Sequence, residues 1–289
     1  MKFSYYDTDM AADSLEKNSL SEIADVKELS HGIVRRTANL RSKELADKIG
    51  RGRGVYVTFD CPLSVFDKEK SVSTLTEYIA SSLVGMAGVQ GKSARVLAVG
   101  LGNDEIAADR LGDRTVKMLR VSPVCEADRK RRKVRLSAVS VGVEGVTGIR
   151  TAEVIEGVCS RIEPSCVLAI DSLATASPER LGTSFQLTTA GITPSGGVGV
   201  GKTPVNRETL GVPVIGIGVP LVLSLRTALS EFAGEYTAAI GCKGNEYQLR
   251  RIMDERKLGC LVVAPKDVKS RVELAASVIA GAVNLAFGE

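Results

Sequence analysis

Apolar residues follow two periodic patterns along this chain. Short runs rich in β-branched residues are typical of buried strands, whereas apolar positions three or four residues apart are typical of one helix face. The first pattern predicts strands at residues 55–59, 96–100, 136–143, 166–170, 212–217 and 260–264.

Helix signals fill several of the intervals between these runs. Ser42 is a suitable N-cap for a helix over residues 43–49, and Gly50 can end that helix because glycine readily adopts a left-handed conformation. Apolar faces predict further helices through Leu75, Ile79, Leu83 and Met86, over residues 111–119, through Ala152, Ile155, Val158 and Ile162, and from about Val268 onward.

This alternation predicts an α/β fold, a three-layer α/β/α domain in which helices cover both faces of a mixed, mostly parallel sheet. No internal repeat or low-complexity linker divides the 289 residues, so we expect one domain with loop insertions. The first 20 residues are polar, acidic and aperiodic, which predicts an extension outside the core.

Composition and charge disfavour several kinds of site. The six cysteines include no C-x-x-C pair and His31 is the only histidine, which argues against a zinc site of ordinary spacing and against a Ser-His-Asp triad. The net charge is +4, and the basic stretch at residues 129–135 contains no aromatic residues, so we expect a solvated loop there. We therefore predict no metal, no cofactor and no direct contact with nucleic acid.

The chain also carries no membrane or export signal that we recognise. No segment approaches about 18 uninterrupted apolar residues, and the N-terminus has no apolar leader segment. Unpaired cysteines inside apolar runs fit a reducing compartment. These features predict a soluble protein of the cytoplasm with no membrane partner.

Two acidic residues follow predicted strands. Asp109 comes shortly after the strand and turn at residues 96–103, and Asp171 closes the strand run VLAID. The carboxyl ends of parallel strands meet at one edge of a sheet, where clefts form. Two carboxyl groups brought together there divide acid and base roles, because both cannot ionise cheaply. A helix cap or turn is an equally good interpretation of either aspartate alone.

A glycine loop raises the separate question of nucleotide binding. Residues 196–203 match the P-loop pattern G-x-x-x-x-G-K-S/T. The chain after it allows barely two helical turns before Gly211 and Pro213, whereas a P-loop opens a longer helix. We expect a loop that approaches a backbone or another subunit closely, which glycines permit.

Five blocks in order resemble the spore germination protease family over nearly the whole chain: GLGNDEIAADRLGDR, GVTGIRTAEVI, CVLAIDSLATASPERLGTSFQL, GITPSGGVGVGK and ETLGVPVIGIGVP. The resemblance implies an endopeptidase that begins the degradation of small acid-soluble spore proteins during germination. It also implies a zymogen, a homo-oligomer (a tetramer in the family), a location in the forespore or spore core, and a fold related to hydrogenase-maturation proteases.

The resemblance also assigns residues. It places an unusual aspartic-type pair on Asp109 and Asp171, with Gly102, Asn103, Gly196, Gly197 and Gly199 in supporting loops. The segment Thr8-Asp9-Met10-Ala11-Ala12-Asp13 has the form of the family's processing site. We therefore predict self-cleavage between Asp9 and Met10, with residues 1–9 as a propeptide and residues 10–289 as the protease domain.

The chain departs from the family pattern at Arg110, Asp113 and Thr193, and it is shorter between Pro220 and Ala264. Arg110 is expected to favour the ionised form of Asp109 and to leave Asp171 as the proton carrier. Two alternatives stay open. One is a metal-assisted endopeptidase like the hydrogenase-maturation proteases, and the other is a non-catalytic module that binds spore protein or DNA.

Overall fold

A nine-stranded sheet forms the centre of the molecule in a computed structural model that describes residues 8–89, 94–123, 134–193, 203–241, 246–258 and 261–288. Along the sheet lie β1 (Asp25–Glu28), β2 (Val34–Leu40), β3 (Gly54–Asp60), β7 (Ser184–Thr188), β8 (Val214–Ser224), β6 (Cys166–Thr175), β4 (Ala94–Leu101) and β5 (Val134–Gly142), and β9 (Val262–Val263) pairs with β8.

The sheet has a parallel half and an antiparallel half. Strands β8, β6, β4 and β5 run parallel, whereas β1, β2, β3, β7 and β8 pair antiparallel. Strand β8 belongs to both halves, and its partners are β6 on one side and β7 on the other. The fold is therefore α/β with a mixed sheet, as predicted.

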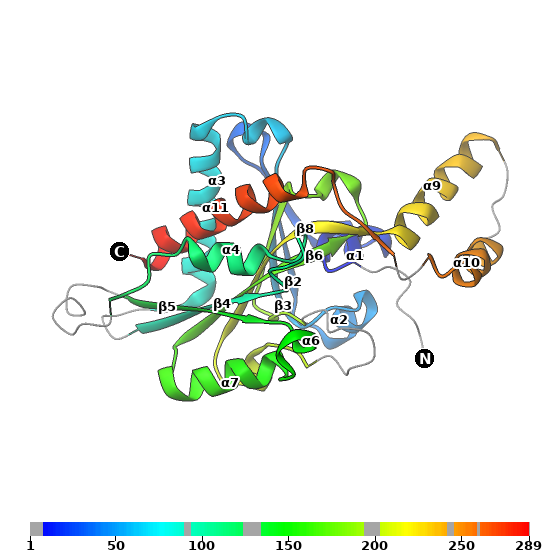
Figure 1. The fold of residues 1–289 in the computed structure, drawn as a ribbon. Helices are drawn as coiled ribbons and strands as arrows, with labels where there is room; N and C mark the ends of the chain where they lie inside the picture. Colours follow the sequence, from blue (N-terminus) through cyan, green and yellow to red (C-terminus); the bar gives the residue numbers. More distant parts are fainter. Residues whose placement is uncertain are drawn as a thin grey trace.

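Helices cover both faces of the sheet (Figure 1). On β4, Val96 and Ala98 belong to one buried core, and Leu97 and Val99 belong to another. Side chains that alternate in this way bury both faces of a strand. The first face packs against α3 (Glu69–Ala87), α4 (Leu111–Lys117) and α11 (Val268–Phe287), and the second against α1 (Ala11–Lys17), α2 (Lys43–Ile49) and α7 (Thr151–Ile162).

The helices and strands that were predicted from local sequence patterns are confirmed. The Ser42 side chain accepts a hydrogen bond from the Leu45 N–H at the start of α2, and Gly50 ends the helix in the left-handed region. The predicted helices at α3, α4, α7 and α11 and the predicted strands at β3, β4, β5, β6, β8 and β9 are all present.

The prediction that the first 20 residues lie outside the core is wrong. Residues 11–17 form α1, and Ala11 and Leu15 pack in a buried cluster with Leu40 and Tyr56 of the antiparallel half. Met10 is fully buried as well. The polar, acidic sequence hides this role because its polar groups bond to distant parts of the chain.

Several elements were not predicted. They are β1, β2, β7, the short helices α6 (Glu144–Thr147) and α8 (Arg207–Leu210), and the helices α9 (Leu225–Ala239) and α10 (Glu246–Glu255), together with 3-10 turns at Ser21–Ile23, Ser30–Gly32, Leu63–Val65 and Pro178–Arg180. Helices α9 and α10 extend away from the sheet (Figure 1).

Helix α11 is, among the described residues, the one helix long and apolar enough to cross a membrane. Its residues Val272, Ala276, Ile279 and Val283 are buried in the same core as Leu75, Ile79 and Leu83 of α3. This packing is that of a core helix.

Some predictions fall outside the described residues. These include Gly196, Gly197 and Gly199 of the glycine loop, most of the basic stretch at residues 129–135, and Cys125, Cys242 and Cys260. The first described helix after the glycine loop is α8, which has only four residues, is capped by Asn206 and ends at Gly211. A P-loop needs a longer helix at this point.

Candidate active site

Asp171 lies in the parallel half of the sheet, one residue beyond the last pair between β6 and its neighbour β4. Strand β6 pairs with β4 as far as Ile170, and Asp171 pairs instead with Gly218 of β8. The expectation that β6 ends at Asp171 is wrong, because β6 continues to Thr175 along β8. The Asp171 side chain is buried, and its carboxylate accepts a hydrogen bond from the N–H of Ser172 at 2.9 Å.

Asp109 lies in the loop that connects β4 to α4. Its carboxylate accepts a hydrogen bond from the N–H of Asn103 at 2.8 Å, and its own N–H donates to the Ile106 carbonyl. Gly102 has φ +99°, and a Cβ there would lie 1.9 Å from the Asp109 carbonyl oxygen. Gly102 and Asn103 therefore hold Asp109 through backbone contacts that a larger residue at 102 would break.

Gly102→Ala is expected to displace Asp109 and to abolish most activity, because the new methyl group would overlap backbone rather than a mobile side chain. The matched control is Gly88→Ala, since Gly88 also has positive φ but has open space around its Cβ position. The control should lose about 1–2 kcal/mol of unfolding free energy and keep its activity. Equal activity in the two variants would contradict the proposal that Gly102 holds Asp109 in place. Urea unfolding curves of both variants should be measured alongside the activity.

The pKa values of the two aspartates are both raised. Burial raises the pKa of Asp171 well above its ordinary value, and the nearby charges of Asp109 and Asp9 raise it further. Burial also raises the pKa of Asp109, against the effect of the Asn103 N–H. The structure therefore brings Asp109 and Asp9 within electrostatic reach of Asp171, and favours Asp171 as the protonated member.

The expectation that Arg110 favours the ionised form of Asp109 is wrong, whereas the raised pKa of Asp171 agrees with the expectation that Asp171 carries the proton. The pKa of Asp109 is raised, not lowered, and the group that opposes the rise is the backbone N–H of Asn103. Asp113, another departure from the family pattern, has partners in the structure. It forms an ion pair with Lys117 at 2.7 Å and accepts a hydrogen bond from Ser140.

A raised pKa at Asp171 predicts a pH-dependent stability cost. The folded state favours the protonated form, so the contribution of Asp171 to the unfolding free energy is highest below its ordinary pKa of 3.8 and falls as pH rises toward the raised pKa. Asp171→Asn removes this cost and should melt at a higher temperature than the unsubstituted chain at neutral pH. Thermal melts between pH 3.5 and pH 8 should show the gap growing with pH, and a constant gap would contradict the raised pKa.

A cleft of about 270 Å³ lies beside Asp171, lined among others by Asp9, Arg51, Tyr56, Gln186 and Thr193. Thr193 and Pro204, the described residues that precede and follow the glycine loop in the sequence, are among the residues that line the cleft. We call this space the Asp171 cleft. Asp9 thus lines the same cleft as Asp171, the candidate catalytic acid. It lies four residues before Asp13, a buried acid of α1.

The segment around Asp9 is held by hydrogen bonds on both sides. The Asp9 N–H donates to the Ala174 carbonyl at 2.8 Å, and the Ala174 N–H donates to the Asp9 carboxylate at 2.9 Å. The Gln186 side chain donates to the Asp9 carbonyl and accepts from the Ala11 N–H. Arg51 donates to the Thr8 carbonyl.

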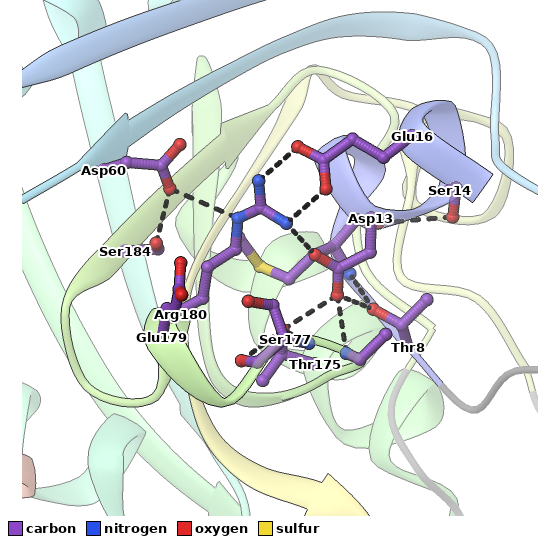
Figure 2. Close-up of polar contacts among 12 residues, drawn as sticks. Thr8, Asp13, Ser14, Glu16, Asp60, Thr175, Ser177, Glu179, Arg180 and Ser184 are labelled. Atoms are coloured by element: carbon purple, nitrogen blue, oxygen red, sulfur yellow. Dashed lines mark hydrogen bonds and ion pairs between the residues drawn. The ribbon is translucent and has the colours of Figure 1, made fainter. Parts of the chain in front are cut away.

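Helix α1 is anchored beside this segment by a buried ion network. Figure 2 shows Asp13, Glu16 and Asp60 turned toward the Arg180 guanidinium group. The Asp13 carboxylate also accepts hydrogen bonds from Thr8, Thr175 and the Ala176 N–H. Burial would lower the pKa of Arg180, but the bond to Glu16 and the surrounding acids raise it, so the group stays charged.

Comparison with known proteins decides the family. The family model of germination proteases matches residues 6–247 of the chain. This chain belongs to the germination protease family. It is therefore a peptidase, a hydrolase that cleaves peptide bonds.

Relatives support the assignment over most of the chain. A germination protease of Caldanaerobacter subterraneus is 30% identical, with 97% of this chain and 93% of that protein covered. One from Bacillus subtilis is 33% identical, with 78% and 65% covered. Among solved structures, a NiFe hydrogenase maturation protease of Thermococcus kodakarensis matches with a TM-score of 0.38 and 16% identity, covering 70% of this chain and 99% of that one.

Sequence reasoning missed Arg180 and Gln186. Arg180 follows a turn-forming proline and is unremarkable in sequence, so only its three acidic partners reveal it. Gln186 carried a usable signal, because it is a polar residue at the centre of the alternating run SFQLT. Recognising that run as a buried strand would have marked Gln186 as a buried polar group in need of partners.

Proposed function

We propose that this peptidase is an endopeptidase that begins the degradation of small acid-soluble spore proteins during germination. The observation that carries the proposal is the buried Asp171, within electrostatic reach of Asp109, beside a cleft that holds the chain's own acidic segment. The resemblance of the ordered sequence blocks supplies the substrate class. The proposed place of action is the cytoplasm of the forespore and the spore core.

In the proposed chemistry one carboxyl group of the pair is protonated and the other is ionised. Asp109, ionised, takes a proton from a water molecule whose oxygen attacks the carbonyl carbon of the residue before the cut. Asp171, protonated, gives its proton to the carbonyl oxygen or the leaving amine. The C–N bond then breaks, and the products are a carboxyl group and a free amino terminus. The raised pKa of Asp171 supports this order of roles.

We also propose that the chain is a zymogen that cleaves itself between Asp9 and Met10, so that residues 1–9 are a propeptide. Both sides of this bond are tied to the sheet, through Ala174 and Gln186. A substrate-like segment in this position blocks the Asp171 cleft until it is cut. Mass spectrometry of the incubated chain should show loss of residues 1–9 and a new terminus at Met10, and a stable intact mass would contradict self-processing.

The deciding experiment mixes the processed chain with a purified small acid-soluble spore protein. We expect internal cleavage that continues in the presence of EDTA. Activity lost with EDTA and restored by a divalent metal would favour a metal-assisted reaction instead. Binding without cleavage would favour a non-catalytic module.

We propose further that the protein is a homo-oligomer. Large apolar side chains of the protruding helices are exposed, including Phe232, Tyr236 and Ile240 of α9 and its C-cap, and Ile252 of α10. Such a group of exposed apolar residues is typical of an interface. Light scattering after size exclusion should give a mass that is a multiple of 30.6 kDa.

A further inference from the structure

Gln186 is the buried amide side chain nearest to the proposed cleavage point. It lies at the centre of β7 and pairs with Gly218 of β8, which in turn pairs with Asp171 of β6. Residues that are directly opposite on neighbouring strands point to the same face of a sheet. Gln186 and Asp171 therefore project from the same face, on either side of a glycine that has no side chain.

The two polar atoms of the Gln186 amide contact the backbone on both sides of the Asp9–Met10 bond. Nε2 donates a hydrogen bond to the Asp9 carbonyl oxygen at 3.0 Å, and Oε1 accepts one from the Ala11 N–H at 2.7 Å. The Ala11 N–H can only donate and the Asp9 carbonyl can only accept, so the pair sets the orientation of the amide. The donor end is thus directed at the carbonyl of the bond to be cut.

We propose that Gln186 is a catalytic residue that stabilises the negative charge on the carbonyl oxygen of the residue before the cut. The inference rests on the proposed self-processing between Asp9 and Met10. When water adds to that carbonyl carbon, the carbonyl oxygen gains negative charge and the hydrogen bond from Nε2 strengthens. A fixed donor at this position lowers the barrier without reorganisation during the reaction.

The neutrality of the amide matters beside two acids. A lysine or arginine at position 186 would place a positive charge near Asp171 and favour its ionised form. An amide donates to the oxygen and leaves the raised pKa of Asp171 intact. The Oε1 contact with the Ala11 N–H also keeps the segment after the cut in register, two residues beyond Asp9. Once residues 1–9 have left, Ala11 still occupies Oε1, and the Nε2 donor is the part of the amide that becomes available to the carbonyl of a spore protein substrate.

The test measures the cleavage rate in two variants and one control. Gln186→Met removes both hydrogen bonds at similar length, and Gln186→Glu removes the amide donor but keeps an acceptor for the Ala11 N–H. The control, Thr58→Val, changes a buried polar side chain directly opposite Gln186 on β3. Readouts are the first-order rate of self-processing by mass spectrometry, kcat and KM for a small acid-soluble spore protein, and the melting temperature.

We expect both Gln186 variants to lower the self-processing rate and kcat by about 100- to 1,000-fold, with KM changed by less than about 3-fold. Thr58→Val should stay near the unsubstituted rate. If Gln186→Met melts below the assay temperature, Gln186→Glu decides the result. A rise in KM with unchanged kcat would overturn the role of Gln186 and leave the proposed function intact. Full cleavage rates in folded Gln186 variants, with the unsubstituted chain active, would do the same. Failure of the unsubstituted chain to cleave either substrate overturns the proposed function as well.

Discussion

Replacing Asp171 with Asn is expected to lower peptidase activity by about 1,000-fold or more, and Asp109→Asn should have a similar effect. An amide cannot hold or release the proton that hydrolysis needs, yet it keeps the volume of the carboxyl group. The Asn oxygen can also still accept the hydrogen bond from Ser172 or Asn103. The measurement is kcat/KM on a small acid-soluble spore protein.

The matched control is Asp113→Asn, at an aspartate on α4 that is buried like Asp171 but bonds to Lys117 and Ser140. It should keep activity within about 3-fold, the range expected of sites remote from the chemistry. Full activity in Asp109→Asn or Asp171→Asn would reject the carboxylate pair. Equal loss in all three variants would point to a structural effect rather than to proton transfer.

Replacing Arg180 with Leu is expected to lower the unfolding free energy by about 3–5 kcal/mol. Only 2% of the Asp13 side chain is exposed, so the substitution leaves a buried carboxylate without its cation. Glu16 and Asp60 lose the same partner. Because α1 is the element that this network anchors, the Asp9 segment should detach and self-processing should slow as well.

Urea unfolding should be measured in an Asp171→Asn background, which keeps the chain unprocessed. The double variant Arg180→Leu with Asp13→Leu removes both charges of the most buried pair and should recover part of the lost stability, since Asp13 no longer leaves a buried carboxylate without its cation. A loss below about 1 kcal/mol in the single variant, the range of exposed ion pairs, would contradict the buried network.

Local sequence patterns were sufficient to predict those elements whose stabilising contacts lie within a few residues. Ser42 and Gly50 bound α2 through groups within one helical turn, and the apolar stripe of α7 buries Ala152, Ile155 and Cys159 as periodicity requires. Strand-end reasoning placed Asp109 correctly in the connection from β4 to α4, whereas Asp171 lies within β6, which continues to Thr175.

Prediction failed where the partners are far apart in sequence. The acidic run of α1 was interpreted as an extension, but Asp13 bonds to Thr175, Ala176 and Arg180, more than 160 residues away. Strand β7 of the antiparallel half was missed for the same reason, because it lies between β3 and β8 and both of its pairings are long-range. No periodicity in residues 8–20 carries that information.

By itself, the sequence determined the α/β class and most helices and strands of the parallel half, and it singled out the two aspartates that we propose as the catalytic pair. The tertiary structure decided that Asp171 is buried with a raised pKa near Asp109, that residues 8–17 are part of the core, and that Gln186 contacts both sides of the Asp9–Met10 bond. The reason is physical: propensity and periodicity act within a few residues, whereas burial, charge coupling and hydrogen bonds across the sheet exist only once distant strands have paired.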